Sequence, residues 1–569
     1  MHQSAAIMSF CSLTNHFFCS IFLDCDFIAQ ALAYCFYKIR GLMIVIIEKL
    51  VLNALKLNVN WHAELTVPIS RELNVPRDAV RGYEILSSSV DSRRGMPKIL
   101  LKVAVDLKRS FPHLSEASAE ELAALRPVEL VMPEKITVKH PLVIGTGPAG
   151  ISAAWYLAAA GCEPVILDKG SAADERVSAY KKFLQTRVLD VNSNLLIGEG
   201  GAGTFSDGKL YTGTKDHRGR FLKELWVKCG APQEILWKSR PHIGSDNLAD
   251  MSIRLRQEII ALGGTFRFNS EVTELIVENG CCRGVVLASG EKIYAPAVVL
   301  APGLGGRDLL RRVCKYAAWE FKPFQTGCRV ETPQETVDRA MYHLSSRPAA
   351  LSAAEYHIVS RAEAGNVSSF CMCPGGHVVN ATAWEGHSIS NGMSCFDRGG
   401  DFANSCLITT LFPENYGSAE ELFSMFDMLE KNIFAAGGGD YTLPAQDTAA
   451  FVRGTAGLKN VSHCCDTGIV AARLDRILLP ALRDALIPAV ANFNRRIPGF
   501  AAQSKFIGAE SFVSSPVRLL REPFTMENPL VKGLYPAGEG CGLAGGIVSA
   551  ACDGIRAAEA VAGVPQNIL

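Results

Sequence analysis

The sequence has no excess of charge of either sign, because its 569 residues include 57 lysines and arginines and 57 aspartates and glutamates. A neutral chain creates no long-range field that would draw it to nucleic acid or to an anionic membrane surface. We therefore expect neither of these partners. A small molecule or a neutral protein surface fits the composition better.

The short motifs of metal sites and of serine hydrolases are also missing. None of the 18 cysteines forms a Cys-x-x-Cys pair, and the 12 histidines show no His-x-x-x-His spacing. No Gly-x-Ser-x-Gly elbow occurs, so no nucleophilic triad can be argued. A chain of this length builds a large core and does not need a disulfide framework. We expect no metal site, and mostly reduced cysteines in a cytoplasmic protein.

Residues 1–42 differ in composition from the rest, being apolar and cysteine-rich with no lysine or arginine before Lys38. A signal peptide needs a basic start and an uninterrupted apolar region, but Asp24 and Asp26 precede the only suitable cleavage triplet. Scattered polar residues also dilute any membrane-spanning run. The favoured interpretation is a misassigned start with Met43 as the true first residue. A membrane-associated tail and a signal peptide are the alternatives.

The length predicts several domains. Residues 43–110 have the pattern of a small α/β module, and residues 111–138 that of a helix-bearing linker. The module has 11 basic and 7 acidic residues up to Arg109, a net charge of +4. A solvated surface is the favoured interpretation of this charge, and RNA binding is the alternative. Strand-like runs at 43–52, 80–90 and 97–107 and a helix-like run at 68–74 make up the module.

A strand, a glycine turn, a helix and a second strand follow one another over residues 141–170. Gly145 suits the tight turn, Gly147 the close approach of a pyrophosphate, and Gly150 the packing of helix on strand. The positive end of the helix points at the phosphates. Asp168 ends the second strand, where a carboxylate can accept hydrogen bonds from an adenosine ribose. This context predicts a dinucleotide site.

A second glycine turn occurs near the end of the chain. A short strand ends at Gly538 and Glu539, and further glycines lead into a helix. A ligand that uses both turns needs a second ring system beyond its diphosphate, which indicates FAD. Glu539 would hold the ribityl hydroxyls, and the helix dipole would stabilise negative charge on the reduced flavin. A glycine-rich helix cap with a solvent-exposed Glu539 is the alternative.

Beyond these two turns, the chain resembles the two-dinucleotide-binding-fold flavoproteins, and specifically the uncharacterised bacterial FAD-dependent dehydrogenases. The resemblance runs from about Met43 to the C-terminus. It implies an α/β fold with a Rossmann-like FAD domain of the glutathione-reductase type, split by an inserted α+β substrate domain. The FAD domain is expected to comprise residues 139–310 and 505–569, and the substrate domain residues 311–504. The segments that carry the resemblance include "GTGPAG", "GEGGAGTFSDGKLYTG", "PHIGSDNL", "FCMCPGG", "SSPVR" and "YPAGEGCGLAGGIVSAA".

The resemblance also implies hydride transfer between flavin and a small organic substrate that it does not identify. Most of the wider group has Asp where Glu539 stands, which favours a water-mediated ribityl contact. Lys209 either lies near the flavin and favours its reduced anion or is a surface lysine, and the surface interpretation is slightly favoured. The candidate cofactor-binding residues are Gly145, Gly147, Pro148, Ala149, Gly150, Asp168, Lys169, Gly200, Gly201, Thr204, Ser206, Lys209, Val272, Ala301, Gly303, Gly538, Glu539, Gly545, Gly546 and Ile547.

Some features of related enzymes are absent. After the first glycine turn there is no Cys-x4-Cys or Cys-x-x-Cys pair, which argues against a disulfide reductase, and residues 171–504 contain no second full glycine motif. NAD(P)H would therefore dock only transiently. Cys371 and Cys373 are expected to be free thiols, because residues two apart rarely meet disulfide geometry. No catalytic residue can be assigned, and a flavoprotein without net redox or an RNA-modifying or RNA-binding flavoprotein are the rival functions.

Overall fold

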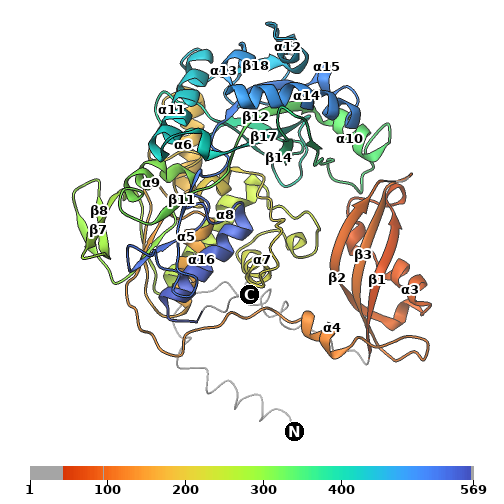
Figure 1. The fold of residues 1–569 in the computed structure, drawn as a ribbon. Helices are drawn as coiled ribbons and strands as arrows, with labels where there is room; N and C mark the ends of the chain where they lie inside the picture. Colours follow the sequence, from red (N-terminus) through yellow and green to blue (C-terminus); the bar gives the residue numbers. More distant parts are fainter. Residues whose placement is uncertain (1–42, 94, 460, 566–569) are drawn as a thin grey trace.

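The computed structural model describes residues 43–93, 95–459 and 461–565. A small sheet module lies to one side of a parallel-sheet domain, and a larger mixed-sheet domain lies above that domain (Figure 1). Residues 1–42, for which a misassigned start, a membrane-associated tail and a signal peptide are the interpretations, lie outside the described residues. Among the helices of the described ranges, none combines the length and apolar composition needed to cross a bilayer.

The N-terminal module is a three-stranded antiparallel sheet with one α-helix, and its elements lie where the sequence predicted them. The strand order is β1-β3-β2, with β3 paired to both neighbours. The module contacts the rest of the chain through Ser88, whose N–H donates to the carbonyl of Trp237 at 2.8 Å. Its elements are β1 (Met43–Asn53), α3 (Thr66–Leu73), β2 (Val80–Asp91) and β3 (Lys98–Leu107).

A five-stranded parallel sheet forms the centre of the nucleotide-binding domain. Its order, β22-β10-β4-β5-β6, places the last strand of the chain beside β10. The expected Rossmann-like α/β fold is thereby confirmed, with one sheet built from both ends of a split domain. The strands are β4 (Leu142–Ile144), β5 (Val165–Leu167), β6 (Thr265–Arg267), β10 (Val298–Leu300) and β22 (Leu534–Pro536).

Both faces of this parallel sheet are covered, because its strands have apolar side chains on both sides. Val143 and Val299 pack toward α5 (Pro148–Ala159), α8 (Ser245–Ala261) and α16 (Ile547–Val561). Leu142 and Leu300 pack on the opposite face, toward a three-stranded antiparallel sheet. That sheet comprises β7 (Val272–Glu278), β8 (Cys281–Leu287) and β9 (Lys292–Tyr294).

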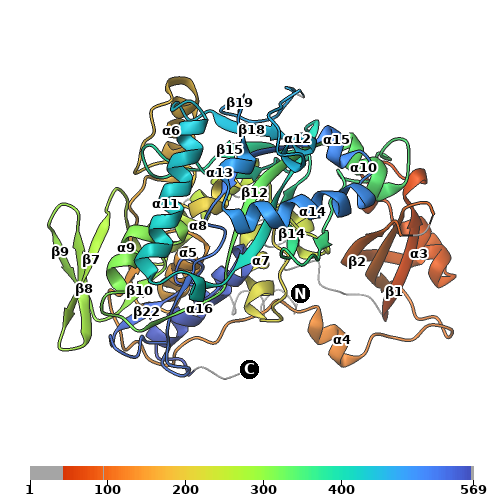
Figure 2. The same cartoon turned by 45° about the horizontal axis from the view of Figure 1, so that its top comes forward.

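The upper domain is built on a seven-stranded mixed sheet in the order β13-β14-β17-β12-β20-β18-β19. Figure 2 shows two long helices, α11 (Ala419–Ala436) and α14 (Pro480–Arg496), lying over this domain. Leu486 and Phe493 of α14 join the same core cluster as Leu407 of the sheet. The strands are β12 (Phe324–Pro333), β13 (Val359–Ser360), β14 (Val367–Cys373), β17 (Phe402–Leu411), β18 (Leu443–Asp447), β19 (Ile469–Ala471) and β20 (Lys505–Glu510).

The chain crosses between the two large domains through a short antiparallel ladder. β11 (Trp319–Phe321) pairs with β21 (Val517–Leu519), so the outgoing and returning segments lie side by side. β20 pairs with β12 and β18, inside the upper sheet. The boundary predicted at residue 504 is therefore too early, and the return to the nucleotide-binding domain follows β20.

Candidate functional site

The first glycine turn joins β4 to α5, and its backbone leaves no room for side chains. Gly145 has a φ of +92°, and a Cβ there would lie 2.3 Å from the carbonyl oxygen of Ala301. A Cβ on Gly150 would lie 1.9 Å from the carbonyl oxygen of Gly145. Glycine alone fits both positions without a shift of the backbone. These two residues therefore shape the turn.

Gly147 differs from its neighbours, because the space beside it is open. A Cβ on Gly147 would meet only the Cα of Gly201, at 3.9 Å. Gly147 is also the N-cap residue of α5. The first N–H groups of a helix have no partner within it and carry partial positive charge. A phosphate group therefore fits the open space at this helix end.

Asp168 follows β5 and holds the first glycine turn. One carboxylate oxygen accepts from the N–H of Thr146 at 2.8 Å and from its hydroxyl at 2.5 Å. The other accepts from the N–H of Gly170 at 2.8 Å. A carboxylate has about four acceptor sites, so one is left for a hydroxyl of a ligand. Asp168 is consequently a structural residue of the turn as well as a candidate ribose contact.

Arg176 fixes the glycine-rich segment that passes Gly147. This fully buried side chain donates to the carbonyl oxygens of Asn194, at 2.7 Å, and of Gly201, at 3.0 Å. Glu199, also fully buried, accepts from the N–H of Ala173 at 2.8 Å. No sequence signal pointed to either charged residue, because both act on backbone groups that only the fold brings near them.

The second glycine turn lies between β22 and α16. Gly538 has a φ of +79° and donates its N–H to Asp553 at 2.8 Å, and Gly546, with a φ of +90°, is the N-cap residue of α16. Burial raises the pKa of the Glu539 carboxyl to about 7, and the nearby Glu510 adds to the rise while Lys322 opposes it. Glu539 therefore changes charge near neutral pH, unlike an ordinary surface carboxylate.

Both turns open on one cavity of about 750 Å³. This volume is in the range of pockets for drug-sized and cofactor ligands. Three predicted residues, Gly150, Gly200 and Thr204, lie behind the wall rather than in it. Thr204, for example, donates its hydroxyl to the carbonyl of Glu199. The predicted residues that line the cavity are Gly145, Gly147, Pro148, Ala149, Asp168, Lys169, Gly201, Ser206, Lys209, Val272, Ala301, Gly303, Gly538, Glu539, Gly545, Gly546 and Ile547.

Lys209 is not the surface residue that the sequence slightly favoured. Its side chain is 11% exposed, and its ammonium group lies 2.6 Å from a carboxylate oxygen of the buried Asp207. Burial lowers the pKa of Lys209, but Asp207 and the nearby thiols outweigh this effect and hold it above its usual range. Asp207 also accepts from Arg398 at 2.7 Å and from Ser394 at 2.9 Å. An ion pair of Lys209 and Asp207 therefore lines the cavity.

Cys371 and Cys373 carry free thiols, as predicted. Cys371 lines the cavity, and Cys373 is buried beside it. Two buried residues of the upper domain that the sequence did not indicate lie close by. Arg329 forms an ion pair with Glu510, and it donates to the carbonyl oxygen of Cys371 at 2.9 Å. The upper domain therefore contributes the carboxyl group of Glu510 to one wall.

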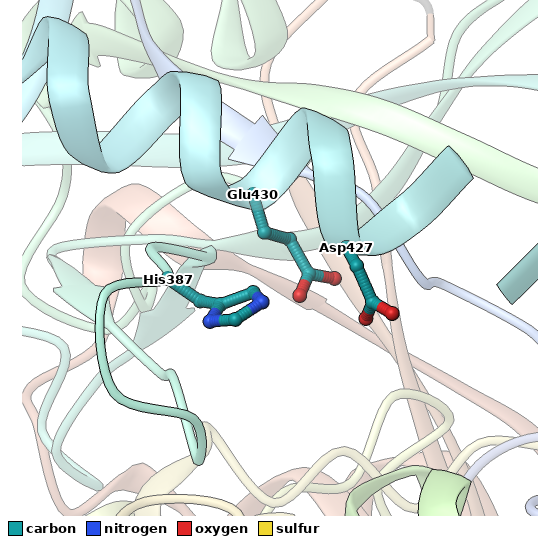
Figure 3. Close-up of side chains that lie close together, drawn as sticks. All are labelled: His387, Asp427 and Glu430. Carbon is teal, nitrogen blue, oxygen red and sulfur yellow. The ribbon is translucent and has the colours of Figure 1, made fainter. Parts of the chain in front are cut away.

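His387, Asp427 and Glu430 bring potential ligand atoms within 4.8 Å of one another (Figure 3). Arg307, however, donates to both carboxylate oxygens of Glu430, at 3.0 and 2.9 Å, and pairs with Asp427 at 2.9 Å. Ser511 adds a further hydrogen bond to Glu430 at 2.6 Å. The guanidinium supplies the positive charge that a metal ion would otherwise supply. We interpret the group as an ion-pair cluster.

Two segments of the chain match models of known protein families. The family model "FAD-dependent protein, C-terminal domain-like" matches residues 323–512, and the model "NAD(P)-binding Rossmann-like domain" matches residues 143–196. Among solved structures, L-proline dehydrogenase from P. horikoshii has a TM-score of 0.33 and 12% identity, covering 76% of this chain and 95% of its own. Glycine oxidase from Bacillus cereus has a TM-score of 0.31 and 12% identity, covering 76% and 99%. These structural scores are too low to carry an argument about the reaction.

A relative in Clostridium beijerinckii, described as an uncharacterized protein, is 36% identical over 503 residues. The match covers 86% of this chain and 94% of the relative. Such identity over nearly the whole length shows common family membership. The chain therefore belongs to the family of this relative, as an FAD-dependent protein with a Rossmann-like nucleotide-binding domain.

Proposed function

We propose that the protein is an FAD-dependent oxidoreductase that transfers hydride between flavin and a small organic molecule. The observation that carries the proposal is that two helix N-termini, each preceded by a glycine turn, open on one cavity. The turns lie far apart in the sequence and meet because β4 and β22 flank β10. A single dinucleotide with two ring systems accounts for both turns.

The lining residues suggest how FAD would lie. Asp168, Lys169 and Val272 would hold the adenosine end, and Gly147 at the start of α5 would receive the pyrophosphate. Glu539 at the second turn would contact the ribityl chain. FAD, when bound, supplies hydride transfer at its flavin ring. The N-terminus of α16 would stabilise negative charge at that end of the cavity.

The upper domain is proposed to hold the substrate. Tyr356, Met372 and Asn391 line the cavity beside Cys371 and Glu510, so apolar and polar groups are mixed on this wall. The positive charge of Lys209 at the same cavity would favour an anionic reduced flavin or a substrate that gains negative charge. NAD(P)H remains a candidate for the second half-reaction, by transient docking.

Anaerobic reduction tests the redox function. The FAD-loaded protein is mixed without oxygen with NADH or NADPH, and the visible flavin absorbance is followed, with dithionite defining the fully reduced spectrum. We expect one nicotinamide to bleach the flavin faster than the other. Two results together would instead support a flavoprotein without net redox. Neither nicotinamide would bleach the flavin, and organic acceptors would not reoxidise the dithionite-reduced protein.

A further inference from the structure

Two neighbouring segments bring Lys209, Tyr211 and Arg240 to the wall of the cavity. The N–H of Leu210 donates to the carbonyl of Pro241 at 2.9 Å, so the segments that carry the three residues lie side by side. Tyr211 and the Arg240 side chain are about half exposed, whereas the Lys209 side chain is 11% exposed. The cavity is therefore open to solvent at Arg240, and Lys209 lies deeper.

The N-terminal module holds the segment that carries Arg240. The N–H of Ser239 donates to the carbonyl of Ser88 in β2 at 2.8 Å, and the Ser88 N–H donates to the carbonyl of Trp237. The ring of Trp237 packs against that of Trp61 in the module, with centroids 6.2 Å apart. The backbone before Arg240 is thus fixed by the module, which places this arginine at the opening of the cavity.

Lys209 and Arg240 are the two ends of a chain of alternating charges. Lys209 pairs with Asp207 at 2.6 Å, and Asp207 pairs with Arg398 at 2.7 Å. Arg398 also pairs with Glu355, which lies 3.4 Å from Arg240. Three cations and two carboxylates leave one positive charge in surplus. Each inner group has two neighbours of opposite sign, and each end has one.

The neighbouring charges do not remove this surplus. Glu510, which also lines the cavity, is paired with Arg329, and Lys238 is paired with Glu234. A surplus charge in a partly buried network is stabilised by a bound group of opposite sign. One negative charge at the Arg240 end would continue the alternation and balance the network.

Apolar side chains line the cavity beside the charged chain. Tyr356 follows Glu355 in the sequence, and Phe370 and Met372 flank Cys371. Phe370 is 41% exposed although it lines the cavity. A ligand with a charged end and an apolar body therefore fits this part of the wall better than a uniformly polar ligand.

We propose that the substrate is a small organic acid, whose carboxylate binds to Arg240 and Tyr211 at the outer end of the charged chain. A guanidinium matches the planar fork of a carboxylate, and the phenol of Tyr211 can donate a further hydrogen bond. A phosphate, with a charge near −2, would exceed the single surplus charge. That this acid is the substrate rests on the proposed function, but its binding can be measured without flavin.

Calorimetric titration at pH 7 tests the carboxylate site with three acids of increasing length: benzoate, phenylacetate and 3-phenylpropionate. The amide of each acid is the neutral control. We expect at least one acid to bind at least about tenfold more tightly than its amide, because only the acid forms charge-assisted hydrogen bonds. Arg240→Gln should remove most of this preference. Arg77→Gln, on an exposed arginine of the N-terminal module, should keep it.

A change at Glu355 should act in the opposite direction. Glu355→Gln releases Arg240 and adds a second surplus charge, so the preferred acid should bind at least about threefold more tightly. General damage to the fold would not tighten binding. Cys371, a neighbour of Tyr211, would offset the surplus charge as a thiolate. Cys371→Ala should therefore bind the acid at least as tightly as the parent protein.

Equal affinity for every acid and its amide, or no binding of any of the three acids, would overturn the proposal. So would an unchanged preference in Arg240→Gln, or tighter binding of phenyl phosphate than of every acid. In FAD-loaded protein, the preferred acid should perturb the visible flavin spectrum with the Kd found by calorimetry. Binding without this perturbation would contradict a substrate beside the flavin. If the protein binds no FAD, the proposed function fails, while calorimetry still decides whether the carboxylate site exists.

Discussion

Asp168 has a structural role in addition to the ribose contact proposed for it. Its carboxylate accepts three hydrogen bonds from Thr146 and Gly170, so the residue expected at the ribose also ties the glycine turn to the end of β5. The sequence indicated the ribose contact from the position of the acid alone. It could not indicate the link to Thr146, which depends on how the turn folds back over the sheet.

Asp168→Ala should weaken FAD binding by about 1–3 kcal/mol and also lower thermal stability, because it leaves the buried N–H of Thr146 without a partner. Thr146→Val is the matched control, since it removes only the hydroxyl and should have a smaller effect on both. FAD affinity from fluorescence titration and thermal unfolding of the two variants provide the check. Unchanged cofactor affinity in Asp168→Ala would show that the ribose assignment is wrong.

Glu539 should make stability depend on pH. Its pKa is raised to about 7 in the folded protein from an ordinary 4.5, so its contribution to stability is full below pH 4.5 and is lost as pH rises through 7. Glu539→Gln removes this loss, which is at most about 3 kcal/mol. Without FAD, the stability of the variant relative to the parent protein should therefore increase as the pH rises from 4.5 to 7.

Thermal unfolding at pH 5 and pH 8 measures this gain, and Glu129→Gln, on an exposed side chain, is the control. A difference between Glu539→Gln and the parent that is the same at both pH values would contradict a raised pKa.

Lys209 and Cys371 mark the limit of sequence reasoning at this scale. Their chemistry depends on neighbours far away in the chain: Arg398 supports Asp207 beside Lys209, and Arg329 contacts Cys371. A sequence shows that a lysine follows a glycine-rich segment, but it does not show which charges the fold will bury with it. Local motifs were therefore predictable, and the charged wall was not.

At the scale of elements, the Arg307 cluster joins α9 (Arg307–Val313) to α11. The guanidinium also stacks on Trp384, with its central carbon 3.9 Å from the ring centroid. Arg307→Met should destabilise the protein by about 3–5 kcal/mol, because it leaves the fully buried Glu430 without its positive partner.

The double variant Arg307→Met/Glu430→Gln should recover some of this loss, because the unpaired charge is gone. Thermal unfolding of the two variants and the parent provides the test. Equal stability of Arg307→Met and the parent would contradict the ion-pair interpretation of this cluster.

For the strands, the sequence predicts where a strand forms better than it predicts which sheet the strand joins. Alternation of apolar residues predicted the three strands of the N-terminal module, because that alternation lies within each strand and does not depend on which strand it pairs with. The placement of β20 was missed, since its partners β12 and β18 lie far upstream. Its buried run, Lys505–Glu510, gives no local sign of the sheet that it joins.

At the scale of the whole molecule, the α/β fold and the family were predictable, because two glycine turns and several longer segments together resemble those of a known family. The cavity between them was predictable only in outline. Both turns lie at the carboxyl ends of parallel strands, so the topology brings them to the same edge of the sheet. The wall from the upper domain depends on packing between distant segments, which explains why no catalytic residue could be assigned.

FAD is proposed to lie across both glycine turns, and FAD binding by Gly147→Ala is the decisive measurement. A Cβ at Gly147 meets no atom closer than 3.9 Å, so the variant should fold while its methyl group occupies the space assigned to the pyrophosphate. Gly82→Ala, where a Cβ meets nothing within 4 Å in the N-terminal module, is the matched control.

We expect the parent protein and Gly82→Ala to show flavin absorption with about one FAD per chain, and Gly147→Ala to bind FAD at least about tenfold more weakly, or ~1.4 kcal/mol. A colourless parent protein that cannot be reconstituted with FAD, or equal FAD affinity in all three proteins, would contradict FAD binding across the two turns.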